Sequence, residues 1–320
     1  MAFTVARSPE EWLAKFGDPV GEARPSDLTV GNFDGVHRGH RKILHAVVDR
    51  ARRNSHLAAV VTFDPHPLRV LRPQEAPPLI MTLDQRLSAM SALGLDAVLV
   101  LTFNQALSLL SPEEFAKAIL ADTLHAKAVL VGDSFRFGHR QSGNTEHLRR
   151  LGQQLGFDVE TIPPVVSEGV VVSSSEIRSA VRQGRVARAA DLLGRPFTLS
   201  GEIRPGTGLG RKLVVPTLNL KADQELLPHT GVYVTEVRVL DEVYRAATNV
   251  GVRPTFDGTH LTVESHLFDF SQEVTSGALE VAFLERIRDE RKFSGPESLR
   301  EQIMRDLDDA RDFFKSRVEG

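Results

Sequence analysis

The chain has 320 residues, of which 41% are hydrophobic and 25% are charged, and these values are close to those of average globular proteins. Its 39 lysine and arginine residues against 42 aspartate and glutamate residues give a formal net charge of −3, which argues against a protein that coats nucleic acid or an anionic membrane. Because the chain contains no cysteine, disulfides, thiolate nucleophiles, zinc–thiolate sites and iron–sulfur clusters are excluded.

The N-terminal residues are charged early and contain no apolar stretch like that of a signal peptide. No apolar run approaches the roughly 18 residues that a membrane helix needs. One domain usually takes about 150 residues, so the length predicts roughly two domains. We therefore expect a cytoplasmic protein of two domains.

The first half of the chain alternates short apolar runs with helical patterns. Strands are predicted at residues 28–30, 57–63, 97–103, 127–131 and 158–162. Helices are predicted from the loop 31–40 onward, from the capping box at Thr82 to near Gly94, from Ser111 with Pro112 at the first helical position, and over 145–155. Strands without polar alternation, separated by helices, form parallel sheets covered on both faces, and such sheets bind ligands beyond the carboxyl ends of their strands.

The second half changes character near Gly194. Strands are predicted at 198–204, 232–240, 243–250, 261–268 and 279–287, with glycine and proline between them. This spacing predicts a small antiparallel barrel or sandwich. A closing helix over 296–318 has apolar residues at intervals of three and four. The change between the halves places a domain boundary within 185–196.

The loop 31–40 carries the first candidate site. His37 and His40 are three residues apart where a helix begins, so both imidazoles lie on one face of its first turn. A helix N-terminus offers free N–H groups and a positive dipole end to a phosphate. Two imidazole donors there can stabilise charge that grows on a transferring phosphorus. Gly31 and Gly39 allow close approach of the backbone.

The second candidate site lies in the second half. The stretch 206–212 is rich in glycine but matches neither common phosphate-loop pattern. It is followed by Thr217 and Asn219, which are two apart on an extended segment and therefore share a face. Glu264 alternates with Val263 on a predicted strand.

The chain resembles the bacterial bifunctional riboflavin kinase/FMN adenylyltransferase (FAD synthetase) family. In the first half the stretches GNFDGVHRGH, VTFDPHP, VGDSFRFGHRQSG and VSSSEIRSAVRQG occur in the family's order, at residues 31–40, 61–67, 131–143 and 172–184. In the second half the matching stretches are PTLN, NVGVRPTF, VESHLFDF and RDERKFSG, at residues 216–219, 249–256, 263–270 and 288–295. The resemblance covers roughly residues 29–311.

The resemblance implies a fold and a function for each half. Residues 1–187 would form an α/β Rossmann-like nucleotidylyltransferase domain that joins FMN to an adenylyl group from ATP and releases pyrophosphate. Residues 188–320 would form a small antiparallel β-barrel domain with a C-terminal helix that phosphorylates riboflavin with ATP and Mg²⁺. The implied partners are small-molecule substrates, with no nucleic acid and no membrane, and the expected state is a monomer or weak homo-oligomer.

The resemblance also implies roles for individual residues. In the adenylyltransferase, His37 and His40 would be catalytic, and the nucleotide contacts would be Gly31, Asn32, Phe33, Gly39, Ser174, Ser175 and Arg178. In the kinase, Glu264 would be the base, Thr217 and Asn219 would hold Mg²⁺ and ATP phosphates, and Gly206, Gly208, Gly210 and Arg211 would cover the nucleotide. Flavin contacts would come from Asp64, Asp133, Phe135, Arg288 and Glu290.

The chain departs from the family pattern at two places. Ser134 stands where the family usually carries Asp or Asn, and Asp133 beside it is the candidate to take over that contact. Val214 and Val215 stand where the family pattern has Gly-Phe, and Leu218 stands in place of Ala.

Plainer interpretations of these residues stay open. The two histidines can be ordinary surface residues, Arg178 can lie on a solvated helix face, and Phe135 and Phe137 can be core residues. His66 can be a loop residue held by Pro65 and Pro67 while Asp64 contacts a metal or ribose. Glu264 can face solvent, and Arg288, Glu290 and Arg291 can form an ordinary charged rim or part of a flap that closes over the flavin.

Two alternative functions also stay open. One is an enzyme that has lost one of its two activities. The other is a flavin-sensing or RNA-binding regulator, for which the basic stretch of Arg178, Arg182, Arg185 and Arg188 leaves room.

Overall fold

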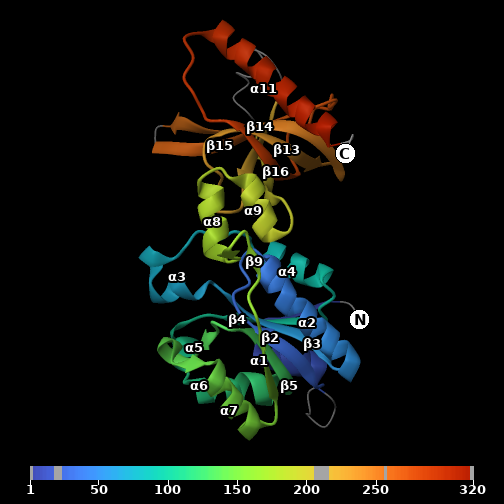
Figure 1. Cartoon of the computed structure of the whole chain (residues 1–320), viewed down its shortest axis with the longest axis vertical. Coiled ribbons are helices and arrows are strands. Elements are labelled where there is room, and N and C mark those ends of the chain that lie inside the picture. The colour runs from blue at the N-terminus through green and yellow to red at the C-terminus, as the bar shows by residue number, and fades with distance from the viewer. Residues whose placement is uncertain (1–2, 18–23, 205–215, 256–257, 318–320) are drawn as a thin grey trace. The chain divides into compact units, whose positions relative to one another are not determined.

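The computed structural model describes residues 3–17, 24–204, 216–255 and 258–317 (Figure 1). The chain divides into two compact units, one formed by Met1–Pro77 and Met81–Val172 and the other by Pro78–Ile80 and Ser173–Gly320. The predicted functional boundary between residues 187 and 188 stays a prediction. Among the described residues, no helix is both long and apolar enough to span a membrane.

The first unit contains a parallel sheet with the strand order β1-β4-β3-β2-β5-β8. The strands are β1 (Thr4–Ala6), β2 (Ser26–Val30), β3 (Leu57–Asp64), β4 (Ala97–Thr102), β5 (Ala126–Gly132) and β8 (Asp158–Ile162). Two short hairpins pair β6 (Arg136–Phe137) with β7 (Gly143–Asn144) and β9 (Val166–Ser167) with β10 (Val170–Val171). The predicted parallel sheet is confirmed, and sequence analysis missed its edge strand β1.

Helices cover both faces of this sheet (Figure 1). The unit contains α1 (Pro9–Phe16), α2 (Arg38–Asn54), α3 (Pro67–Leu71), α4 (Leu83–Ala92), α5 (Gln105–Leu109), α6 (Pro112–Phe115), a π-helix (Ala116–Thr123) and α7 (Thr145–Leu155). Short 3₁₀ turns lie at Pro73–Glu75 and His139–Gln141. The capping boxes predicted at Thr82 and Ser111 both form. In each, the hydroxyl accepts the backbone N–H of the residue three positions later, and the side chain of that residue accepts the backbone N–H of the capping residue.

The second unit is built around a closed antiparallel barrel with the strand order β11-β12-β15-β14-β13-β16. Its elements are α8 (Ser174–Arg182), α9 (Val186–Leu193), β11 (Phe197–Arg204), β12 (Leu218–Ala222), β13 (Gly231–Val239), β14 (Glu242–Thr255), β15 (Gly258–Leu267), β16 (Ala278–Arg288) and α11 (Pro296–Ser316). The barrel interior holds a chain of buried hydroxyls, since Thr248 Oγ1 lies 2.7 Å from Thr235 Oγ1 and 2.8 Å from Ser265 Oγ.

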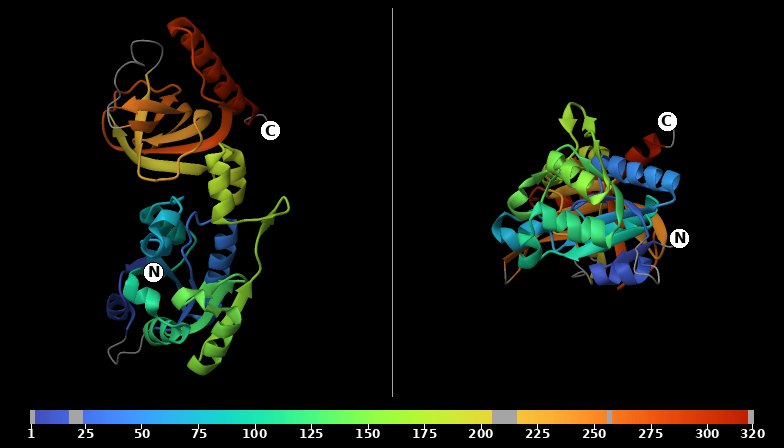
Figure 2. Two further views of the ribbon diagram at one scale, coloured as in Figure 1. Left: turned by 90° about the vertical axis from the view of Figure 1, so that its left-hand side faces the viewer. Right: turned by 90° about the horizontal axis from the view of Figure 1, so that it is seen from below.

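Helix α11 packs on the outer face of the barrel, against strands β13, β14 and β16 (Figure 2). The buried residues that join them are Val234, Ala247, Phe268, Leu284, Leu307, Ala310 and Phe314. Residues two apart on a strand point the same way, so this cluster identifies which strand residues face outward. The predicted barrel and C-terminal helix are therefore confirmed.

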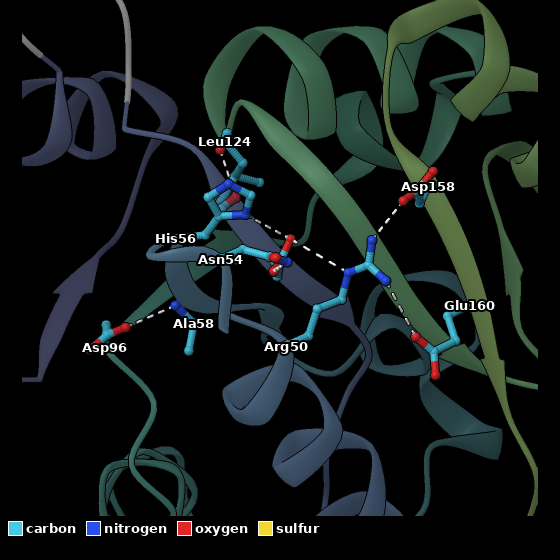
Figure 3. A network of polar contacts seen from close by, with 10 residues as sticks. Arg50, Asn54, His56, Ala58, Asp96, Leu124, Asp158 and Glu160 are labelled. Atoms are coloured by element: carbon cyan, nitrogen blue, oxygen red, sulfur yellow. Dashed lines mark hydrogen bonds and ion pairs between the residues drawn. The ribbon is translucent and has the colours of Figure 1, made fainter. Parts of the chain in front are cut away.

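A buried carboxylate lies at the C-terminal end of α2, in contact with Arg50, Asn54 and His56, which Figure 3 labels. Asp27 of β2 is fully buried, and its oxygens lie 3.2 Å from Asn54 Nδ2 and 3.1 Å from His56 Nδ1. Arg50 of α2 lies 3.9 Å from Asp27 and donates to Asp158 of β8 at 2.6 Å. A buried charge is tolerated where partners surround it. These contacts set the position of α2 on the sheet, and α2 begins at the candidate site.

A second buried carboxylate belongs to the same end of the sheet. Asp96 accepts the Ala58 N–H at 2.8 Å and two hydrogen bonds from Arg52, at 2.6 and 2.9 Å. Burial alone would raise the pKa of Asp96, but the bonds from Arg52 and Ala58 hold this pKa below its ordinary value. The ionised form of Asp96 therefore stabilises the first unit.

We expect Asp96→Asn to lower the free energy of unfolding by about 1–3 kcal/mol near neutral pH, because hydrogen bonds to a charged group are lost. A depressed folded-state pKa gives stabilisation that is present above the unfolded pKa of about 3.9 and is lost as pH falls below it. The difference between variant and wild type should therefore shrink toward about pH 3. Urea unfolding followed by the fluorescence of Trp12, the chain's single tryptophan and fully buried in the first unit, measures this difference. A difference that did not change with pH would contradict the assignment.

Candidate functional site

A sharp turn carries the chain from β2 to α2. The Gly31 N–H donates to the Val61 carbonyl at 3.0 Å, which keeps the start of the loop beside β3. Phe33, Gly35 and Val36 then have φ values of +50°, +91° and +39°. Positive φ is uncommon outside glycine and marks a backbone held by its surroundings. The turn brings His37 to the N-terminus of α2.

His37 caps α2 with its own side chain. Its Nδ1 atom accepts the His40 N–H at 3.3 Å. A neutral imidazole whose Nδ1 accepts a hydrogen bond carries its proton on Nε2. The cap therefore makes His37 Nε2 a hydrogen-bond donor, and His37 itself is buried.

His37 and His40 lie together, as their spacing predicted. Their rings stack with centroids 3.6 Å apart and 18° between planes, and the edge of Phe33 meets His40 at 5.1 Å. Burial, and next the neighbouring His37, lower the pKa of His40 well below its ordinary value, so His40 is neutral at neutral pH. His40 Nδ1 is buried and has no hydrogen-bond partner within the described part of the chain. The interpretation of two unrelated surface histidines is wrong.

Gly39 leaves room for this pair. A Cβ atom at residue 39 would lie 3.1 Å from His37 Cε1 and 3.2 Å from His37 Nδ1. These distances are shorter than ordinary carbon contacts, so any side chain at residue 39 would press on the capping imidazole. A larger residue at this position would therefore require the His37 ring to shift by a few tenths of an ångström.

Arg86 supports the two loops that follow β2 and β3, and sequence analysis missed it. This guanidinium from α4 is 3% exposed and donates to the Asn32 carbonyl at 2.7 Å and to the Phe63 carbonyl at 3.4 Å. Burial lowers the pKa of Arg86, while Asp34 and Asp64 act in the opposite direction. The sequence signal that could have identified Arg86 as buried is its spacing: it precedes Met90 by four residues, so both lie on the same face of α4.

Asn32 and His66 meet beside these loops. Asn32 Nδ2 lies 3.3 Å from His66 Nε2, and His66 Nδ1 accepts the Leu68 N–H at 3.2 Å as the cap of α3. The interpretation of His66 as a loop residue is thus supported by its capping bond. Asp64, at the end of β3, is half-buried, with one oxygen 3.9 Å from Arg86.

The loop after β5 carries the predicted residues Asp133 and Phe135. Asp133 and Ser134 are both exposed. Phe135 is half-buried and stacks on Phe137 with ring centroids 5.5 Å apart, and Phe137 belongs to the core cluster of the first unit. The core interpretation therefore holds for Phe137, and Phe135 is its partly exposed neighbour.

In the second unit, α8 presents the predicted phosphate-binding residues. Ser173 caps the helix by accepting the Glu176 N–H at 3.3 Å, so Ser174 and Ser175 occupy the first turn. Arg178 is 8% exposed and its Nε donates to the Pro78 carbonyl at 2.9 Å. The interpretation of Arg178 as part of a solvated helix face is therefore wrong.

A row of polar side chains crosses neighbouring barrel strands. Glu264 of β15 lies directly opposite Asn219 of β12 on one side and Asn249 of β14 on the other. Asn249 shares its outward face with Ala247, which packs under α11. We call Asn219, Glu264 and Asn249 the polar row. All three side chains are half-buried, so Glu264 does not lie fully in solvent.

Glu290 reaches this row from the connection between β16 and α11. A Cβ atom at Gly251 would lie 2.9 Å from Asn249 Nδ2 and 3.0 Å from Glu290 Oε1. Both side chains therefore rest against the bare backbone of Gly251. Sequence analysis assigned no role to Asn249, although it begins one of the stretches that carry the family resemblance.

Of the remaining kinase candidates, some lie within the described residues and some do not. Thr217 is half-buried and stands two residues before Asn219. Arg288 is bound to Asp306 of α11 by two hydrogen bonds, at 2.8 and 2.6 Å. Predictions that fall outside the described residues concern Gly206, Gly208, Gly210 and Arg211, and also Val214 and Val215. Within the described residues there is no group of three or more His, Cys, Asp or Glu side chains arranged to hold a metal ion.

Two family models match the chain. The model described as FAD synthetase matches residues 21–176, and the model described as riboflavin kinase matches residues 193–314. Together they cover most of the chain in the order that the sequence motifs predicted.

Curated relatives match over nearly their whole length. A bifunctional riboflavin kinase/FMN adenylyltransferase of Escherichia coli strain K12 is 35% identical over 90% of this chain and 92% of its own. A protein of the same name from Pseudomonas fluorescens is 38% identical over 91% of this chain and 93% of its own.

One solved structure is similar over almost the whole chain. The crystal structure titled macrolide-efflux protein from Streptococcus pneumoniae has a TM-score of 0.86 and 29% identity, and the match covers 97% of this chain and 99% of that one. The similarity therefore includes both units.

The lowered pKa of His40 can be measured by NMR. In protein labelled at histidine, we expect one imidazole to keep its neutral chemical shifts while free histidine titrates near about 6.5. Because the folded state resists protonation of His40, stability should rise with pH through this range. His40→Gln should remove that signal and so assign it. A His40 signal that titrated like free histidine would contradict the structure.

Proposed function

The chain belongs to the bifunctional riboflavin kinase/FMN adenylyltransferase family and converts riboflavin to FMN and then FMN to FAD, and on this premise we propose which residues carry each step. The observation that supports the proposal best is the stacked pair of His37 and His40, one of them held as a donor by a cap and the other kept neutral. We place the adenylyltransferase in residues 1–187 and the kinase in residues 188–320.

In the adenylyl transfer, an oxygen of the FMN phosphate attacks the α-phosphorus of ATP. The new bond joins that oxygen to the α-phosphorus, and the bond from the α-phosphorus to the bridging oxygen breaks with its electron pair, which releases pyrophosphate. His37 Nε2 donates a hydrogen bond to an α-phosphate oxygen, and His40 packs beside it and completes the contact. Positioning and fixed donors are sufficient catalysis for such transfer.

We also propose the other nucleotide contacts of this step, which the family resemblance implies. We assign the α-phosphate surroundings to Gly31, Asn32, Phe33 and Gly39, which form the turn and first helical residues around the histidine pair. We assign the β- and γ-phosphates to Ser174, Ser175 and Arg178, because a capped first turn and a partly desolvated guanidinium suit a polyphosphate. Asp64, Asp133 and Phe135 remain proposed flavin contacts.

In the kinase step, the 5′-hydroxyl oxygen of riboflavin attacks the γ-phosphorus of ATP and ADP leaves. Glu264 accepts the hydroxyl proton. Asn219 lies beside Glu264 in the polar row, so acceptor and phosphate contacts come from adjacent strands. We assign nucleotide contacts also to Gly206, Gly208, Gly210 and Arg211, and a flavin contact to Glu290, whereas the other flavin candidate, Arg288, is already bound to Asp306.

The kinase residues fit Mg²⁺. Thr217 and Asn219 supply a hydroxyl and an amide oxygen, and both side chains are half-buried. Mg²⁺ prefers oxygen ligands and in nucleotide sites takes several of them from phosphates and water, so Thr217 and Asn219 would supply only part of its ligands. When bound, Mg²⁺ would neutralise charge on the ATP phosphates.

Two of the four arginines in the basic stretch on α8 and α9 are engaged within the chain. Arg178 is buried and bonded to the Pro78 carbonyl, and Arg188 pairs with Asp191 at 2.6 Å. Arg182 and Arg185 are exposed, so we base the proposal of small-molecule partners on the enzyme family to which the chain belongs. We also propose that the chain works in the cytoplasm, where ATP is its substrate, as a monomer or weak homo-oligomer.

We expect His37→Ala to abolish FAD formation from FMN and ATP, with a loss of about 10²-fold or more, because one donor to the growing charge is gone. FMN formation from riboflavin should be unchanged. Since His37 also caps α2, His37→Asn provides a variant that can still cap the helix, and it should lose FAD formation as well. His45→Ala, an exposed histidine on the same helix, is the matched control. Chromatographic product assays measure both steps, and loss of the kinase step alone would refute the assignment.

We expect Glu264→Gln to slow FMN formation from riboflavin by about 10²- to 10⁴-fold, because the amide cannot accept the hydroxyl proton. FAD formation from supplied FMN should continue at the wild-type rate. Glu202→Gln changes an exposed carboxylate on β11 and should leave both rates unchanged. Near-normal riboflavin phosphorylation by Glu264→Gln would show that another group is the base.

A further inference from the structure

The strand pairing extends the polar row toward Arg288. Asn249 lies opposite Val232 of β13, and Val232 lies opposite Arg288 at the end of β16. Arg288 therefore stands at the same level of the barrel as Glu264. Its guanidinium does not extend freely, because Asp306 of α11 accepts two hydrogen bonds from it, from Nε at 2.8 Å and from Nη2 at 2.6 Å.

This ion pair is largely removed from solvent. Asp306 is 4% exposed, and the Arg288 side chain is 20% exposed. A bidentate arginine–carboxylate pair is both strong and restricted in geometry. Asp306 also accepts a hydrogen bond from Gln302 Nε2 at 2.7 Å, which holds the carboxylate on α11. The pair thus ties the end of β16 to α11.

The connection that follows, residues 289–295, is held at further points. Arg291 donates to the Gln302 side-chain oxygen. The guanidinium groups of Arg288 and Arg291 lie over the ring of Phe293, at 5.8 and 5.0 Å. Neither helix nor strand forms in this connection, so these side-chain contacts are what orders it.

The ordered connection is what brings Glu290 to the polar row. Glu290 is exposed, and its carboxylate rests against Gly251 beside Asn249. Asn249 is in turn the direct neighbour of Glu264. A change in the path of residues 289–295 would therefore move Glu290 relative to Asn249 and Glu264.

We propose that Asp306 is a positioning residue for riboflavin phosphorylation, because through Arg288 it holds the 289–295 connection beside the polar row and so sets the affinity for riboflavin. The proposal rests on the proposed role of Glu264. It replaces the assignment of Arg288 as a direct flavin contact, because the Nε and Nη2 atoms of Arg288 both already donate to Asp306. Asp306 itself touches no substrate in this account.

The test is steady-state kinetics of Asp306→Asn, Arg288→Met and the double variant in the full-length protein. We expect Asp306→Asn to raise the KM for riboflavin about tenfold, equivalent to about 1.4 kcal/mol, with kcat and the KM for ATP changed far less. Arg288→Met should have the same effect, and the double variant should be no worse than either single variant, because both changes remove one interaction. Asp308→Asn on α11, whose exposed carboxylate pairs with Arg311, is the matched control.

Each other outcome overturns the proposal. If Arg288→Met is far more damaging than Asp306→Asn, Arg288 contacts the flavin directly. If the KM for riboflavin stays within about twofold in Asp306→Asn, the ion pair does not position the site. If the variants lower kcat and the KM is unchanged, the pair acts on chemistry rather than binding. Wild-type protein that formed no FMN would instead refute the activity itself.

A readout that does not depend on activity separates positioning from general loss of stability. Trypsin cleaves after Arg291 and Lys292, both within the connection. We expect Asp306→Asn to speed cleavage there while the rate of FAD formation from FMN and the unfolding of the first unit, seen by Trp12, stay unchanged. Should the variant fail to fold, Asp306→Glu keeps the charge and tests the same geometry: it should retain slow cleavage and show a smaller rise in KM. Unchanged cleavage in Asp306→Asn, or faster cleavage in Asp306→Glu with an unchanged KM for riboflavin, would overturn the proposal.

Discussion

The hydrogen bond from the His40 amide to His37 Nδ1 holds the histidine pair of the first unit in place. It ends the turn after β2, caps α2 and assigns the His37 proton to Nε2, so one contact sets backbone and tautomer together. The rest of the first unit supports this bond. Gly39 leaves space for the ring, Arg86 holds the Asn32 carbonyl on the preceding loop, and the buried Asp27 fixes the far end of α2. Changes far from the site along α2 can therefore alter the imidazole pair.

Much of the fold could be predicted from local patterns. The capping boxes at Thr82 and Ser111 are complete in short stretches of sequence, and the pattern over residues 145–155 matches α7. The His37–His40 pair was predictable because a spacing of three residues on a helix needs no knowledge of distant contacts. The edge strand β1 was missed because three residues of β-structure carry little pattern by themselves.

Residues whose roles depend on distant partners could not be derived in this way. Arg86 looks like an interruption in an amphipathic helix until the carbonyls at the ends of β2 and β3 are placed around it. The neighbourhood of Glu264 depends on the register of three strands, and register follows from side-chain packing across a whole barrel. The pairing of Arg288 with Asp306 could not be predicted, because Asp306 lies 18 positions later, on another element.

The short segment Pro78–Ile80 belongs to the second compact unit although both its neighbours in sequence belong to the first. Its carbonyl at Pro78 is what Arg178 binds. The two units are therefore interleaved along the chain, and no single cut separates them cleanly. A fragment that begins at Ser173 would carry α8 without the backbone oxygen that orients its arginine, which would leave a buried guanidinium with one fewer acceptor. Separating the two halves by truncation would thus remove the hydrogen bond between Arg178 and the Pro78 carbonyl, whereas point substitutions elsewhere keep both partners.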